Sequence, residues 1–249
     1  MEGGPAPTQW QPVPTYFERL AEEGVSSAVV SPARFARSGL TGAALRGARH
    51  VPADTLEQRV SAALRELRAG TPVVYLYWSE IDHSGHAHGV ASDAWIGQVE
   101  QFDAGLAMLM RGLPSGVRAV LTADHGMINA ESNSIIDVAS TPALREGVRI
   151  VAGETRAAHV HAEEGRADEV EERWRETLGE SAWVLSRAQM PALIGEGSGA
   201  SVIGDLLVLA RGRGGVVDSR TQSAAAIAMP GIHGSVTPTE MRIPVVTLS

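Results

Sequence analysis

Two short apolar runs in this chain end in the same way, at an acid and a histidine beside glycine. The first lies within Val73 to Gly89, which reads VVYLYWSEIDHSGHAHG, and the second is Val117 to Ala123. β-branched and aromatic runs bounded by turn residues are typical of buried strands. Between them, apolar residues recur at helical spacing from Trp95 to Leu109. A strand, a helix and a strand at this spacing predict a βαβ unit, with the two polar ends at one edge of a parallel sheet.

The polar segments contain five candidate metal ligands, and these are Asp82, His86, Asp124, His125 and His233. Carboxylate oxygens and imidazole nitrogens are ligands that zinc-like ions accept. We expect Gly85 to allow a sharp turn between the first two, and the glycines on either side of His233 to let the backbone approach an ion. The set suits a two-metal hydrolytic site, in which ions about 4 Å apart activate a nucleophile and stabilise the leaving oxygen.

Composition excludes several classes of protein. The 249 residues carry a formal charge of −8 and no block of Lys or Arg, so a nucleic-acid polymer is an unexpected partner. The absence of cysteine excludes disulfides and thiolate ligands. No apolar stretch approaches the roughly 20 residues of a membrane span, and the first fourteen residues lack the features of an export signal. These features predict a cytoplasmic protein that does not bind membranes.

The amino-terminal part predicts alternating helices and strands. Thr15 and Glu18 have capping-box spacing before a helix at 16–23, and a strand is expected at Val25 to Val30. Asp54 and Glu57 repeat this spacing before a helix that ends near Gly70. The first fourteen residues and the stretch from Ser31 to Gly47 are rich in turn residues and predict loops.

The carboxyl-terminal part predicts a small α+β subdomain, at about residues 157–213, within one domain that spans residues 1–249. Strands are expected at 148–152, 159–161, 181–185, 206–210 and 243–248, with a helix at 167–178. His159 and His161 alternate on one of these strands, but no carboxylate is spaced to join them as a metal ligand. The predicted fold is α/β, a mostly parallel sheet flanked by helices.

Three segments together resemble a known family. The segments Asp82-x-x-Gly85-His86-x-x-Gly89, Ala123-Asp124-His125-Gly126-Met127 and Gly231-x-His233-Gly234 look like three successive metal motifs of the type I phosphodiesterase/nucleotide pyrophosphatase family, in the alkaline phosphatase superfamily. The resemblance implies an alkaline phosphatase-like fold with two zinc ions. It implies that Asp82, His86 and His233 hold one ion, and that Asp124 and His125 form part of the second site.

The chain departs from this family at its amino end. The family's second zinc site is completed by an aspartate and by a nucleophilic Thr or Ser, and neither motif is present upstream of the segments above. The chain is therefore expected to be amino-terminally incomplete, with one complete zinc site. Thr41 superficially resembles a nucleophile, but no strand-end aspartate precedes it. The catalytic nucleophile stays unassigned.

The resemblance implies a metal-dependent hydrolase of phosphodiester or nucleotide pyrophosphate bonds, with a small phosphodiester or nucleotide as substrate. The shortened chain would be weakly active or inactive. Two alternatives stay open. One is another hydrolase of the superfamily, a phosphomonoesterase or a sulfatase, and the other is a non-catalytic zinc-binding remnant. The sequence does not indicate the oligomeric state.

Overall fold

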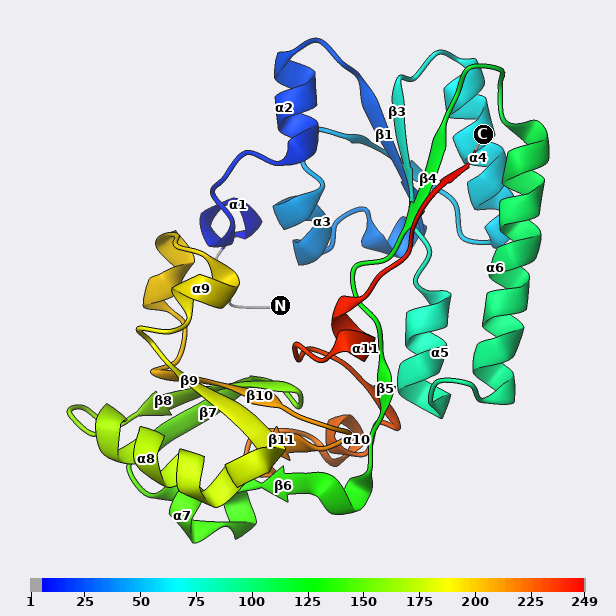
Figure 1. Cartoon of the computed structure of the whole chain (residues 1–249). Coiled ribbons are helices and arrows are strands. Elements are labelled where there is room, and N and C mark those ends of the chain that lie inside the picture. Colours follow the sequence, from blue (N-terminus) through cyan, green and yellow to red (C-terminus); the bar gives the residue numbers. More distant parts are fainter. Residues whose placement is uncertain (1–5, 249) are drawn as a thin grey trace. The chain divides into compact units, whose positions relative to one another are not determined.

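The computed structural model describes residues 6–248, which form two compact units (Figure 1). The first unit contains residues 6–81, 97–121 and 246–248, and the second contains residues 82–96 and 122–245. None of the helices among these residues combines the length and the apolar character needed to cross a membrane.

A parallel three-stranded sheet forms the centre of the first unit. β1 (Ser27–Ser31) lies between β2 (Arg49–Pro52) and β3 (Val73–Leu76), and all five residues of β1 are buried. β-branched residues such as Val29 and Val30 suit this position because they pack well on a pleated surface. This sheet and its helices confirm the predicted α/β class.

Helix α4 (Leu56–Arg68) covers this sheet. Thr55 and Gln58 form its capping box, so the predicted cap at Asp54 and Glu57 was wrong by one residue. The helix presents Ala62 and Ala63 to a cluster of apolar residues from the three strands. These are the small side chains that let a helix approach a sheet closely.

Helix α6 (Asp93–Gly112) confirms the helix predicted between the two apolar runs. It lies close to α4, because a Cβ placed on Gly105 would be 2.5 Å from Leu56 Cδ1. The strand that follows, β4 (Ala119–Thr122), pairs with β13 (Val245–Leu248). Within residues 6–248, β4 makes no ladder with β3, so the parallel pairing expected of a βαβ unit is not formed.

Two stretches predicted as loops contain short helices. Helix α1 (Pro7–Trp10) precedes α2 (Tyr16–Glu22), whose capping box from Thr15 and Glu18 was predicted correctly. Between β1 and β2 lie a 3₁₀ turn, η1 (Ala33–Phe35), and α3 (Gly39–Ala44), which begins at a Ser38 cap. Single helical turns give no periodic pattern, so the sequence could not indicate them.

The second unit contains a four-stranded antiparallel sheet in the order β7 (Val148–Glu154), β8 (Ala157–Ala162), β10 (Leu206–Ala210) and β9 (Ala182–Ser186). Helix α8 (Ala167–Leu178) has the bounds that its sequence pattern predicts. Its Val170, Trp174 and Leu178 are buried in the largest core cluster with residues of the sheet. The small α+β subdomain at about residues 157–213, within one domain that spans residues 1–249, stays a prediction.

Short elements complete the second unit. Two small sheets pair β5 (Ile128–Asn129) with β12 (Gly231–Ile232), and β6 (Ile135–Asp137) with β11 (Gly215–Val217). The remaining turns are α7 (Pro142–Arg145), α9 (Pro191–Ile194), α10 (Ala224–Ile227), α11 (Pro238–Met241), η2 (Ser132–Ser134), η3 (Val138–Ser140), η4 (Gly179–Ser181) and η5 (Ser198–Ser201). A histidine-bearing segment adjoins each strand of the β5–β12 ladder.

Candidate metal centre

Helix α5 (Glu80–His88) carries the first two candidate ligands, Asp82 and His86, one helical turn apart. The turn expected at Gly85 was wrong, because Gly85 is helical. Its lack of a side chain serves packing instead: a Cβ placed there would be 2.4 Å from Met127 Sδ. Spacing of four residues on a helix directs two side chains to one face.

The helix meets strand β12 through a contact between two glycine backbones. A Cβ placed on Gly231 would be 2.1 Å from the carbonyl oxygen of Gly85. This approach brings the His86 ring to the Gly231 carbonyl, with 2.8 Å from Nδ1 to the oxygen. A carbonyl only accepts, so Nδ1 carries a proton, and in the neutral imidazole Nε2 is then the atom with a lone pair.

Three of the candidate ligands meet at distances that suit one ion. His86 Nε2 is 3.2 Å from His233 Nε2. Asp82 Oδ1 is 3.4 Å from His86 Nε2 and 3.8 Å from His233 Nε2. Ligand atoms about 2.0–2.1 Å from a tetrahedral zinc stand about 3.3 Å from each other. The three atoms are therefore spaced like three corners of such a site.

His125 joins this group from the segment after β4. Its ring stacks on His233, with centroids 3.5 Å apart and an interplanar angle of 14°. Its Nδ1 lies 3.0 Å from the Gly126 carbonyl, so in the neutral imidazole Nε2 is again the atom with a lone pair. One ligand atom from each of Asp82, His125 and His233 lies within 4.8 Å of the others. We call Asp82, His86, His125 and His233 the histidine cluster.

Asp82 provides a test of whether a cation fits the histidine cluster. Its Oδ1 is buried and has no hydrogen-bond partner in the part of the chain that the structure describes. Buried polar atoms without partners are rare in folded proteins and destabilise them. His86 Nε2 lies 3.4 Å from this oxygen, so a carboxylate oxygen and an imidazole nitrogen converge here. A divalent cation fits between such donors.

The protonation of His233 also favours metal binding. Burial lowers the pKa of His233, and the nearby His125 acts in the same direction, whereas the Asp82 carboxylate opposes them. The net effect favours the neutral imidazole near pH 7. Neutral imidazole is the form that coordinates metals.

Asp124 does not join the cluster in this structure. Its side chain is 88% exposed, and its Oδ1 is 3.7 Å from His125 Nε2. The division of the ligands between two ions, which the resemblance implies, stays a prediction. Thr41, the weak nucleophile candidate, lies within α3, and its hydroxyl accepts a hydrogen bond from Ser38 at 3.0 Å.

His159 and His161 lie on β8 and are not part of the histidine cluster. Burial lowers the pKa of His159, and His161 adds to the effect. These side chains alternate with the buried Ala158, Val160 and Ala162, as expected for one face of a strand. They therefore offer control positions for the cluster histidines.

A buried ion pair near the cluster was not predicted from the sequence. Arg156 follows the end of β7, and Glu240 lies in α11, and both side chains are at most 1% exposed. Arg156 donates to both carboxylate oxygens of Glu240, at 3.0 Å from Nε and 2.6 Å from the terminal nitrogen. Neither residue belongs to an apolar pattern, so no local signal indicates its burial.

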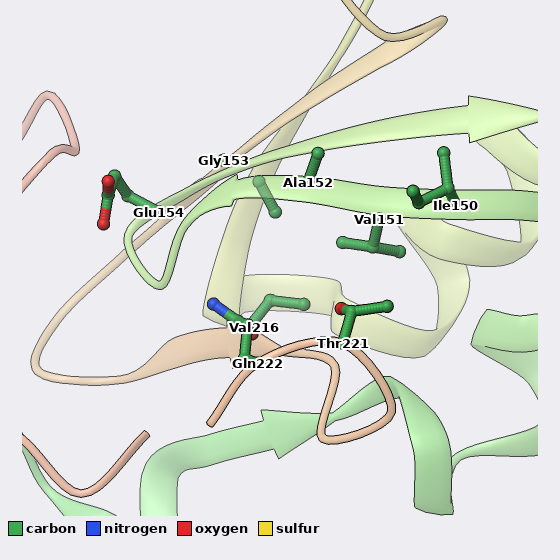
Figure 2. Close-up of a pocket in the computed structure, with 9 residues that line it drawn as sticks. Ile150, Val151, Ala152, Gly153, Glu154, Val216, Thr221 and Gln222 are labelled. Atoms are coloured by element: carbon green, nitrogen blue, oxygen red, sulfur yellow. The ribbon is translucent and has the colours of Figure 1, made fainter. Parts of the chain in front are cut away.

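A separate cavity of about 270 Å³ lies along β7. Figure 2 shows Val151 of β7 directed toward Val216 and Thr221. None of the cluster residues lines this cavity. Glu154 lines it and also lies beside Gly234, since a Cβ on that glycine would be 3.6 Å from Glu154 Cβ. The cavity is mainly apolar and provides no second set of metal ligands among its lining residues.

The solved structures with a similar fold include ectonucleotide pyrophosphatase/phosphodiesterases and a phosphonoacetate hydrolase. The chain resembles murine ectonucleotide pyrophosphatase/phosphodiesterase 5, in an inactive form in complex with AMP, with 17% identity and a TM-score of 0.72 over 93% of this chain and 62% of that one. The human counterpart gives 16% identity and a TM-score of 0.72 over 97% and 64%. The chain thus spans less than two thirds of these proteins.

Phosphonoacetate hydrolase from Sinorhizobium meliloti, in complex with phosphonoformate, is also similar. It shows 19% identity and a TM-score of 0.71, over 94% of this chain and 68% of that one. At these identities the likeness concerns the fold. No curated protein matches the chain significantly in sequence.

A family model gives the decisive match. The model for type I phosphodiesterase/nucleotide pyrophosphatase matches residues 3–235. This range contains every residue of the histidine cluster and nearly the whole chain. The chain therefore belongs to the type I phosphodiesterase/nucleotide pyrophosphatase family.

Proposed function

We propose that this chain forms the metal-binding part of a hydrolase that cleaves phosphodiester or nucleotide pyrophosphate bonds. The observation that carries the proposal is the convergence of Asp82 Oδ1, which has no hydrogen-bond partner among the described residues, on His86 Nε2 at 3.4 Å and His233 Nε2 at 3.8 Å. The family match supports the reaction class. Zinc is the proposed ion, because one carboxylate and up to three imidazoles suit it.

In this proposal, residues of the chain either bind a metal ion or orient the side chains that bind it. Asp82, His86, His125 and His233 supply the donor atoms. The Gly231 and Gly126 carbonyls fix the His86 and His125 tautomers by accepting from Nδ1, which is how outer-shell groups orient metal ligands. A divalent ion bound there would act as a Lewis acid on a phosphoryl oxygen and offset its negative charge. Asp124 is proposed as a ligand of a second ion.

A small substrate is part of the proposal. The bound AMP of the murine protein and the bound phosphonoformate of the bacterial one support a small phosphate or phosphonate ligand. The nucleophile is not assigned to any residue of this chain. The hydrolytic activity of the chain is therefore expected to be low.

The test is zinc-dependent hydrolysis of bis(p-nitrophenyl) phosphate by the full chain. We expect slow turnover that stops after chelation, returns with added zinc and is lost in Asp82→Ala. His161→Ala serves as a control, because His161 lies in the same unit but outside the cluster. Faster hydrolysis of p-nitrophenyl phosphate or p-nitrophenyl sulfate would instead favour a monoesterase or a sulfatase. Bound zinc without any turnover would favour a non-catalytic protein.

A further inference from the structure

Glu240 connects the two segments that carry His233 and His125. Its Oε1 accepts the Ser235 N–H at 3.0 Å, two residues after His233. The Thr237 hydroxyl donates to Oε2. The carboxylate therefore holds the backbone turn that follows His233.

The backbone of Glu240 holds the second segment. Its carbonyl oxygen accepts the N–H of Gly126 at 2.7 Å, directly after His125. The packing here is close, because a Cβ placed on Gly126 would be 2.0 Å from the carbonyl oxygen of Thr239. Glu240 thus contacts the chain next to both stacked histidines.

Arg156 fixes the position of this carboxylate. It donates to both Glu240 oxygens and also to the Gly214 carbonyl at 2.6 Å. Two parallel charge-assisted hydrogen bonds define the carboxylate plane more strictly than a single bond does. Both side chains are almost fully buried, so water does not compete for these contacts.

We propose that Glu240, held by Arg156, is a positioning residue for the metal centre. Its carboxylate accepts the Ser235 N–H in the turn after His233, and its backbone carbonyl accepts the Gly126 N–H after His125. These contacts orient both imidazoles toward the ion. This inference rests on the proposed function. Outer-shell partners of this kind change metal affinity by about 10- to 100-fold in other proteins.

Two double variants separate positioning from stability. Arg156→Met with Glu240→Leu replaces the ion pair by apolar groups, a change that is often neutral for folding. Arg156→Met with Glu240→Gln also removes both charges but keeps an oxygen that can accept from Ser235. The Gly214 carbonyl loses Arg156 as a donor in both variants, so this loss cancels in the comparison. The Gln pair is the matched control.

The readouts are Co²⁺ affinity, measured by chelator competition, and thermal unfolding of the metal-free chain. We expect the Leu pair to bind Co²⁺ about 10- to 100-fold more weakly than the Gln pair, with a changed visible spectrum of the bound ion. The unfolding temperatures of the two metal-free variants are not expected to follow the order of their Co²⁺ affinities. If the Leu pair does not fold, Glu240→Asp replaces it, because the shorter side chain cannot reach Arg156 and Ser235 together.

Two results would overturn the inference, and they differ in what else they contradict. Equal Co²⁺ affinity in the Leu and Gln pairs, with normal binding by the unaltered chain, overturns the role of Glu240 alone. Absence of Co²⁺ binding by the unaltered chain overturns the proposed metal centre as well.

Discussion

His86 and His233 bring their Nε2 atoms to 3.2 Å although 147 positions separate them in the chain. The contact depends on the approach of two glycines, Gly85 in α5 and Gly231 in β12. Because Gly231 bears no side chain, its backbone can approach the Gly85 carbonyl, and two imidazoles from distant segments can face a common point. The approach of His86 to His233 thus depends in part on residues that bear no side chain.

Removal of His233 should reduce metal binding more than any other single histidine change in this unit. His233→Ala removes a donor and the ring on which His125 stacks. We expect zinc affinity to fall by more than the about 10- to 100-fold that follows loss of an outer-shell partner. Equilibrium dialysis against zinc measures this, with His159→Ala as control. Similar losses in both variants would contradict the assignment.

Gly126→Ala should damage both stability and metal binding. The added methyl group would lie 2.0 Å from a backbone oxygen, and backbone cannot move as easily as a side chain. We expect a loss of about 1–3 kcal/mol in the free energy of unfolding, as in other overpacked sites. Urea unfolding checks this value.

Gly97→Ala is the control for this substitution. Gly97 lies within α6, and no atom is within 4 Å of the position that an added methyl group would take. Alanine there should stabilise the chain by about 0.5–1 kcal/mol. Equal effects of the two substitutions would show that the packing at Gly126 is looser than described.

Trp174→Ala should destabilise the second unit strongly. Trp174 is fully buried between α8 and the four-stranded sheet, and its removal leaves a large cavity. We expect a loss of about 3–5 kcal/mol in the free energy of unfolding. Trp183 is 36% exposed, so Trp183→Ala should cost much less. Thermal unfolding followed by circular dichroism distinguishes the two.

The Arg156–Glu240 pair predicts a loss of stability in acid. Burial favours the protonated carboxyl of Glu240, but hydrogen bonds from Arg156, Thr237 and the Ser235 N–H outweigh it and hold the pKa below its ordinary value of 4.5. A lowered folded-state pKa contributes stability that is present above the unfolded value and is lost as pH falls below it. Stability should therefore decline below pH 4.5.

The Arg156→Met/Glu240→Gln chain isolates this contribution, because its residue 240 does not titrate. Urea unfolding of both chains across the acid range should show a steeper decline in the unaltered chain. Parallel curves would mean that Glu240 titrates alike in the folded and unfolded states.

The sequence alone predicted those features whose patterns are long or chemically specific. Helix α8 was predicted to the residue, and the family was identified from motifs around Asp82, His125 and His233. Periodicity and motif chemistry are local properties, so they can be read without knowing the fold.

The remaining features depend on contacts between distant segments. Gly85 was expected in a turn and instead packs inside a helix against Met127. The pairing of β4 with β13 joins segments that are far apart in the chain. The burial of Arg156 and Glu240 likewise has no local signal in the sequence, because each is charged and finds its partners in distant segments of the chain.

The most direct test of the metal centre is X-ray absorption at the zinc edge of the purified, zinc-loaded chain. We expect imidazole scattering from at least two of His86, His125 and His233, at metal–nitrogen distances of about 2.0–2.1 Å, and an oxygen from Asp82. A spectrum without imidazole scattering, or a chain that loses all zinc on dialysis, would contradict the histidine cluster as a metal centre.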